Sequence, residues 1–186
     1  MTNVYFVRHA TPNYGNHDDL TRELTAQGLK DRERVTSFLL DKEIDAVFSS
    51  PYRRSIDTVK QFADAVNLQI KLIDDFRERK IDSAWIDNFD SFCKKQWENF
   101  DFKLQGGESL GEVQKRNINA LNRVLQTHAN QNIVIGSHGT ALSTIINYYD
   151  PSFGCEEFYR IKDLMPFIVK FVFDKDKCIG IEKYEI

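Results

Sequence analysis

Short runs of apolar and β-branched residues alternate along the chain with longer segments in which apolar residues recur every three or four positions. The short runs are typical of buried strands, and the longer spacing is typical of helices with one buried face. The pattern predicts strands at residues 4–7, 44–48, 69–73 and 133–135. It predicts helices at residues 25–41, 52–66, 109–129 and 140–149.

The last two apolar runs, at residues 167–173 and 179–184, flank the turn residues Asp174-Lys175-Asp176. This arrangement is typical of a β-hairpin, which we expect to add antiparallel strands at one edge of the sheet. Elsewhere strands and helices alternate with short connections. The expected fold is therefore α/β: a three-layer α/β/α sandwich with a mostly parallel central sheet and helices on both faces.

The regular pattern breaks down in residues 79–105, which we expect to form a short insertion. This insertion holds six aromatic residues, including both tryptophans of the chain: Trp85, Phe89, Phe92, Trp97, Phe100 and Phe102. Two interpretations are open. The aromatic residues form a small local core, or they form an apolar wall for a substrate with a hydrophobic or planar part.

Length and composition set broad limits on what the chain can be. The 186 residues predict a single domain spanning 1–186, and 41% hydrophobic with 28% charged residues excludes a disordered or low-complexity chain. The net charge of −3 argues against a nucleic-acid partner, and no apolar run is long enough to span a membrane. Neither a signal peptide nor a CxxC pair is visible, so we expect a cytoplasmic protein with free thiols.

Polar residues follow each predicted parallel strand. Arg8 and His9 follow the first strand, Arg54 lies shortly after the second, and His138 follows the fourth. Glu78 lies in the charged segment after the third strand. Because ligands bind beyond the carboxyl ends of the strands in an open α/β sheet, we expect these side chains at one edge.

This combination of side chains favours phosphoryl transfer. Arginine presents a planar fork that matches phosphate oxygens. A neutral imidazole is a competent nucleophile, and a carboxyl group can donate a proton to the leaving oxygen. Since no ligand spacing typical of a metal site occurs, the set predicts a reaction that uses neither a metal ion nor another cofactor.

The order of short motifs along the chain adds a family resemblance. The chain resembles the histidine phosphatase superfamily, the phosphoglycerate mutase-like proteins of branch 1. The resemblance rests on five motifs in the family's order: Val7-Arg8-His9-Ala10, Leu24-Thr25-Ala26-Gln27-Gly28, the segment from Ser49-Ser50-Pro51 to Thr58, Gly106-Gly107-Glu108-Ser109, and Gly136-Ser137-His138-Gly139. Each motif is weak alone, and the ordered set is specific.

The resemblance implies a role for each candidate. It implies that His9 is the nucleophile that becomes phosphohistidine and that Glu78 is the general acid. It further implies that Arg8, Arg54 and His138 bind the phosphoryl group and take part in catalysis. The implied partner is a small phosphorylated substrate, with no nucleic acid or membrane.

Two details qualify the resemblance. Counting from Ser49-Ser50-Pro51 places the family's arginine on Arg54 and not on its neighbour Arg53. Ala10 stands where many members have glycine, and this removes no catalytic group. His17 receives no role.

The resemblance leaves open whether the phosphoryl group passes to water or moves within the substrate. In the family, the insertion between the third strand and the next helix covers the site, and mutases typically carry a longer one. Because residues 79–105 are a short cover, we expect a phosphatase, with a phosphoglycerate mutase-like phosphotransferase or isomerase as the alternative. A scaffold that binds a partner without catalysis would not need the catalytic residues that this chain retains.

Overall fold

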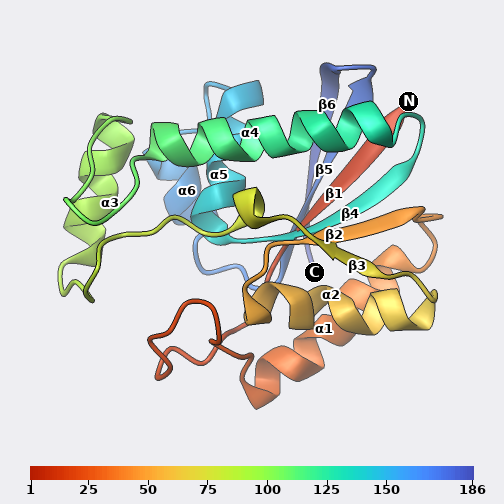
Figure 1. The fold of residues 1–186 in the computed structure, drawn as a ribbon, viewed down its shortest axis with the longest axis horizontal. Helices are drawn as coiled ribbons and strands as arrows, with labels where there is room; N and C mark the ends of the chain where they lie inside the picture. Colours follow the sequence, from red (N-terminus) through yellow and green to blue (C-terminus); the bar gives the residue numbers. More distant parts are fainter.

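A six-stranded sheet runs through the centre of the protein in the computed structural model, which describes residues 1–186 (Figure 1). Its spatial order is β3-β2-β4-β1-β5-β6. The strands are β1 (Thr2–Arg8), β2 (Ala46–Ser49), β3 (Ile70–Leu72), β4 (Asn132–Ser137), β5 (Phe167–Asp174) and β6 (Lys177–Glu185). Strands β1 to β4 pair in parallel, whereas β5 and β6 are antiparallel. The mostly parallel sheet with a hairpin at its edge is confirmed.

Helices lie on both faces of this sheet. They are α1 (Ala26–Leu39), α2 (Arg53–Ala65), α3 (Phe89–Glu98), α4 (Leu110–Thr127), α5 (Gly139–Tyr149) and α6 (Cys155–Ile161), with a 3-10 turn η1 (Asp74–Phe76). Figure 1 shows α4 along one side of the sheet and α1 and α2 along the other. No helix combines the length and the apolar character needed to cross a bilayer.

Alternate residues of the central strand β1 point into two different cores. Val4 and Phe6 belong to the larger core, which includes apolar residues of α4 and α5. Tyr5 and Val7 belong to the smaller core, which includes apolar residues of α1 and α2. Because both faces of the strand are covered, every one of these four positions is apolar. The predicted α/β/α sandwich is therefore confirmed.

The helix ends follow local sequence signals. The Ser109 side chain accepts from the Glu112 N–H while the Glu112 side chain accepts from the Ser109 N–H, a capping box that starts α4. Thr25 caps α1 by accepting from the Gly28 N–H. Helix α5 ends at Tyr149, and its C-cap Asp150 directly precedes Pro151, as the pattern predicts.

Two helices were not predicted. Helix α3 lies within the irregular segment 79–105, and its cap is Asn88, whose side chain accepts from the Ser91 N–H. Helix α6 has only seven residues. Both helices are short, so their periodic signal is weak, and they gain stability from packing against the rest of the protein.

Candidate active site

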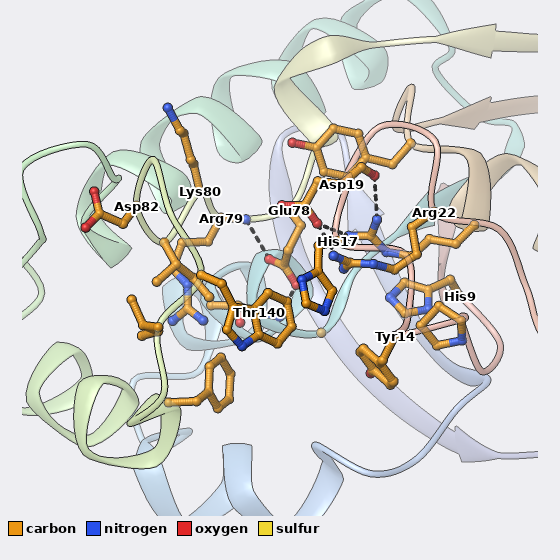
Figure 2. Close-up of a pocket in the computed structure, with 18 of the residues that line it drawn as sticks. His9, Tyr14, His17, Asp19, Arg22, Glu78, Arg79, Lys80, Asp82 and Thr140 are labelled. Carbon is orange, nitrogen blue, oxygen red and sulfur yellow. Dashed lines mark hydrogen bonds and ion pairs between the residues drawn. The ribbon is translucent and has the colours of Figure 1, made fainter.

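A cavity of about 710 Å³ opens at the carboxyl ends of the parallel strands (Figure 2). The strand register brings the candidate residues to this edge, because Arg8 pairs with Ser137 and Ser49 pairs with Gly136. The polar residues that follow β1, β2 and β4 therefore lie at the same level. Arg8, His9, Arg54 and Glu78 all line the cavity.

His9 is buried in one defined orientation. Its Nδ1 lies 2.8 Å from the carbonyl oxygen of Ala10. A carbonyl oxygen only accepts, so Nδ1 carries the hydrogen and Nε2 of the neutral ring keeps its lone pair. Burial, followed by the positive charges of Arg54 and Arg8, holds the pKa of His9 well below its ordinary value. The ring is therefore neutral near pH 7, with a free nitrogen.

Arg8 is held from behind by backbone carbonyl groups. Its Nη1 donates to the carbonyl oxygens of Ile161 (2.8 Å) and Leu164 (3.1 Å), and its Nε has no partner. A Cβ atom at Gly139 would lie only 3.0 Å from Arg8 Nη2. Glycine at the first position of α5 thus lets the helix backbone approach the guanidinium closely.

Arg54 is anchored by a residue that sequence reasoning did not find. Its Nη1 donates to the Asp19 carbonyl oxygen (2.7 Å), and its Nη2 lies 3.3 Å from Asp19 Oδ1. The same carboxylate pairs at 3.0 Å with buried Arg22, which also lines the cavity. Asp19 and Arg22 lie in an irregular loop with no periodic pattern, so only the folded chain brings them here. By contrast, Arg53 is largely exposed and pairs with Asp57.

His138 lies behind the cavity wall. It is completely buried, and its ring centre is 5.3 Å from that of His9. Its Nε2 is 2.7 Å from the Ser50 hydroxyl, whereas its Nδ1 has no partner. Burial, then the charge of Arg54, lowers the pKa of His138 well below the ordinary value. His138 therefore brings a neutral ring with one unpaired polar atom beside His9.

Glu78 sits at the start of helix α5. Its Oε2 accepts from the Thr140 N–H (3.0 Å), and its Oε1 accepts from the N–H groups of Ala141 (2.9 Å) and Arg79 (2.7 Å). The first turn of a helix has free N–H groups and favours negative charge. The structure thus brings the five candidate residues together in and directly behind one cavity.

The residues of this site lie in a part of the sequence that matches a known protein family. The sequence matches the histidine phosphatase superfamily (branch 1) over residues 4–178, a range that includes all of the residues above. The chain belongs to this family. Membership of this family, together with its similarity to proteins named as phosphatases, identifies the chain as a phosphoric monoester hydrolase.

Similar proteins and structures agree with the family. The chain is 29% identical to Phosphoserine phosphatase 1 of Hydrogenobacter thermophilus over 152 residues, covering 74% of this chain and 71% of the relative. The structure of Bacillus stearothermophilus YhfR has a TM-score of 0.78 at 18% identity, covering 96% of this chain and 94% of that one. A mutant phosphoserine phosphatase of Entamoeba histolytica, in complex with phosphoserine, also has a TM-score of 0.78, at 19% identity and 97% and 96% coverage.

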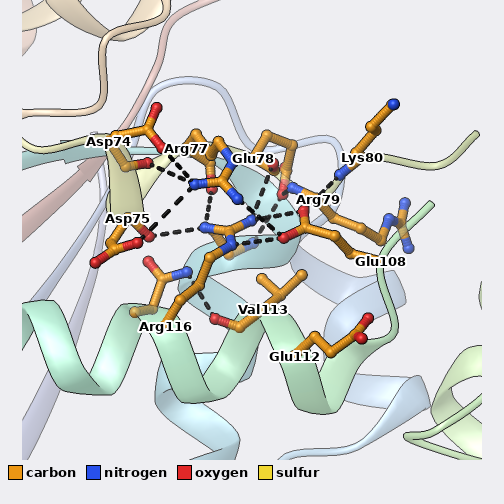
Figure 3. Close-up of polar contacts among 12 residues, drawn as sticks. Asp74, Asp75, Arg77, Glu78, Arg79, Lys80, Glu108, Glu112, Val113 and Arg116 are labelled. Atoms are coloured by element: carbon orange, nitrogen blue, oxygen red, sulfur yellow. Dashed lines mark hydrogen bonds and ion pairs between the residues drawn. The ribbon is translucent and has the colours of Figure 1, made fainter. Parts of the chain in front are cut away.

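An ion-pair network in this histidine phosphatase supports the Glu78 segment (Figure 3). Arg116 on α4 pairs with Glu108 through two bonds, from Nε (2.8 Å) and Nη2 (2.9 Å). Arg116 also donates to three backbone carbonyl oxygens, those of Asp75 (2.7 Å), Arg77 (2.8 Å) and Glu78 (3.1 Å). Arg116 thus ties the backbone that carries Glu78 to helix α4.

Glu108 completes the network from the other side. Its Oε2 accepts from the Lys80 N–H at 3.0 Å. Burial acts to raise the pKa of Glu108, but the hydrogen bonds from Arg116 and Lys80 outweigh it and the pKa is lowered. The Gly-Gly-Glu-Ser motif was visible in the sequence, whereas the position of Arg116 beneath Glu78 was not.

The aromatic residues of segment 79–105 divide into two groups. Phe92, Trp97 and Phe102 pack on the larger core, and Phe100 lies against Trp97 at 5.5 Å between ring centres. Trp85 and Phe89 instead are exposed and line the cavity. The first group therefore belongs to the core, whereas Trp85 and Phe89 are the members of the cluster placed where they can contact a bound substrate.

Proposed function

We propose that this hydrolase cleaves a small phosphomonoester through a covalent phosphohistidine on His9, without a metal ion. The observation that carries this proposal is the His9 ring itself. Its Nδ1 is bound to a backbone carbonyl, so Nε2 is the nitrogen left to attack phosphorus. Two buried arginines, Arg8 and Arg54, lie around it and match the charge of a phosphoryl group.

The first step transfers the phosphoryl group to His9. The ester binds with its phosphoryl oxygens on Arg8 and Arg54, and Nε2 of His9 attacks phosphorus in line with the leaving oxygen. The P–N bond forms as the P–O bond breaks, and the carboxyl group of Glu78 gives its proton to the leaving alcohol.

The second step returns the enzyme to its starting state. A water molecule attacks phosphorus, its proton passes to the Glu78 carboxylate, and the P–N bond breaks. Inorganic phosphate leaves and His9 is again neutral. Positioned acid–base groups of this kind contribute about 10²–10⁴-fold to a rate.

Arginines supply the positive charge that the phosphoryl group needs. A guanidinium has five N–H donors, and those of Arg8 and Arg54 that are not held by Ile161, Leu164 and Asp19 are free to meet phosphoryl oxygens. The neutral ring of His138 lies next to His9, with 5.3 Å between the ring centres. Donors fixed before the reaction stabilise developing charge without reorganisation.

Exposure of the cavity rim favours hydrolysis over internal transfer. Trp85 and Tyr14 line the cavity and are 60% and 52% exposed, so the site is open to water.

Relatives named for phosphoserine make phosphoserine a first candidate substrate. A second candidate is 3-phosphoglyceric acid, which is bound in another Entamoeba histolytica phosphoserine phosphatase structure. Three free cysteines also favour a reducing compartment such as the cytoplasm.

The test is to trap the intermediate. The enzyme is mixed with a ³²P-labelled phosphomonoester and quenched in acid or in alkali, since phosphohistidine is labile in acid and stable in base. We expect label on the wild type after the alkaline quench only, and none on His9→Ala. His128→Ala is the matched control, because His128 lies at the opposite end of the sheet, after α4. Label on His9→Ala would overturn the mechanism, and loss of activity in EDTA would overturn metal independence.

A further inference from the structure

Exposed aromatic side chains gather at the mouth of the cavity. Four aromatic residues of the chain are strongly exposed: Tyr14, Trp85, Phe89 and Tyr148. Three of these, all but Tyr148, line this one cavity. Single exposed apolar residues are ordinary, but an apolar cluster that surrounds a cavity marks a binding surface.

Two rings at the mouth already lie face to face. His17 and Trp85 stack with their ring centres 4.2 Å apart and their planes 11° apart. His17 comes from the loop after β1, and Trp85 comes from segment 79–105. A flat surface is thus present across the mouth of the free protein, built from two segments that are distant in sequence.

Phe89 is fixed by a different contact. The Arg79 guanidinium lies 5.6 Å from the centre of the Phe89 ring and 5.2 Å from that of Phe92. Arg79 is buried and donates to Gln96 Oε1 at 2.6 Å. The Phe89 ring therefore packs against a buried side chain and forms part of the cavity wall in the free protein.

The cavity is larger than a phosphoserine requires. Pockets of about 300–1,000 Å³ accommodate drug-sized ligands, and this one measures about 710 Å³. Arg8, His9, Arg54 and Glu78 form what we call the inner half. Tyr14, His17, Trp85 and Phe89 form the outer half, which a phosphoryl group bound at His9 leaves free.

We propose that the outer half binds a planar ring, and that the preferred substrate is a phosphomonoester whose alcohol part carries an aromatic or heteroaromatic ring. This inference rests on the proposed function, because the phosphoryl group must bind at His9 for the ring to reach Trp85. Ring-on-ring stacking with this indole provides the selectivity, and the exposed position of the mouth keeps the product free to leave.

Alkyl esters whose leaving alcohols are of similar acidity test the proposal. We compare 2-phenylethyl with ethyl phosphate and 4-phenylbutyl with butyl phosphate, so that each pair has alcohols of similar acidity and two reaches are covered. The cyclohexyl analogues have the same reach without a planar ring. We expect the better phenyl ester to exceed both its ring-free parent and its cyclohexyl analogue in kcat/KM by about tenfold, which corresponds to ~1.4 kcal/mol.

Variants locate the effect. Trp85→Ala is expected to bring kcat/KM for the phenyl esters close to that for the ring-free esters, and Trp85→Phe is expected to restore the preference in part. Tyr148→Ala is the matched control, since Tyr148 is also more than half exposed and lies outside the cavity. It should keep the full preference.

Binding separates this inference from the proposed function. Calorimetry with 3-phenylpropylphosphonate and propylphosphonate, which cannot be hydrolysed, measures the ring site without turnover. Equal kcat/KM for phenyl and ring-free esters, equal values for phenyl and cyclohexyl esters, or an unchanged preference in Trp85→Ala would each overturn the ring site. Tight binding of the phenyl phosphonate with no hydrolysis of any ester would support the ring site and overturn the proposed function.

Discussion

Apart from Glu78, the inner half of the cavity is carried by the end of a strand and the start of a helix, whereas the outer half is carried by two irregular segments and the first residue of α3. Arg8 is the last residue of β1 and His9 follows it, and both are buried. Trp85 and Tyr14 belong to irregular segments and are more than half exposed. Groups that perform chemistry must be held in one geometry, and regular elements do this well. Loops tolerate change, so selectivity is placed where the chain can vary.

The largest expected effect concerns His9, the proposed nucleophile of the inner half. We expect His9→Ala to lower kcat on the order of 10⁴-fold or more, because no other ring nitrogen takes its place. Steady-state turnover of phosphoserine or a phenylalkyl phosphate measures this, with a thermal melt to show that the variant is folded. His128→Ala should stay within about twofold of the wild type, and an equal loss there would show that the effect is not specific to His9.

The next effect separates two adjacent arginines. Arg54→Ala removes a buried cation beside His9, and we expect kcat/KM to fall by about 10²–10³-fold. Arg53→Ala changes the neighbouring residue, whose side chain is exposed and pairs with Asp57, and it should have almost no effect. Similar losses in the two variants would contradict the assignment of Arg54.

A smaller effect is expected from the network behind Glu78. Arg116→Ala frees the backbone of residues 75–78 and leaves Glu108 without its main partner. We expect kcat to fall about ten- to a hundredfold with little change in KM, and the free energy of unfolding to fall by ~1–3 kcal/mol. Lys115→Ala, an exposed residue next to Arg116 on the same helix, is the control. A change in stability without a change in kcat would show that the network supports the fold alone.

The same network predicts how stability depends on pH. The pKa of Glu108 is lowered in the folded protein, so its contribution is present above its unfolded value, about 4.3, and is lost as the pH falls through the lower folded value. Denaturant unfolding of the wild type should therefore lose stability more steeply below pH 4.3 than that of Arg116→Ala. Parallel curves would contradict the pairing.

The pH dependence of the first chemical step tests the state of His9. Its pKa lies well below the ordinary value of about 6.5, so His9 stays neutral in mildly acidic solution. A histidine with the ordinary pKa would lose about tenfold in its neutral form between pH 7.5 and 5.5. We expect the rate of phosphoenzyme formation at saturating ester to fall less than about twofold over this range. A decline centred near pH 6.5 would contradict the burial effect.

The sequence predicted the inner half well because its residues follow strands. Arg8, His9 and His138 adjoin buried apolar runs, and the parallel pairing of β1, β2 and β4 brings the residues after those runs together. Arg54 was separated from Arg53 by counting within one motif. In each case the signal was local, and the geometry of a parallel sheet supplied the rest.

The partners of these residues were not predictable in the same way. Asp19 and Arg22 lie in a loop without periodicity, and Arg116 is one of several charged residues on a long amphipathic helix. Their roles depend on contacts across many residues of sequence, such as those of Arg116 with the backbone near Glu78. The division of the aromatic cluster was equally hidden, because both groups lie within one short segment.

By itself, the sequence determined the three-layer fold and the residues that meet at its edge, since strand pattern and motif spacing act locally. Only the tertiary structure decided which nitrogen of His9 is free, which side chains hold Arg54, and which aromatic rings face the cavity. Those properties depend on distances of a few ångströms between segments far apart in the chain. Such distances are set by tertiary packing, which the spacing of residues along the sequence does not predict.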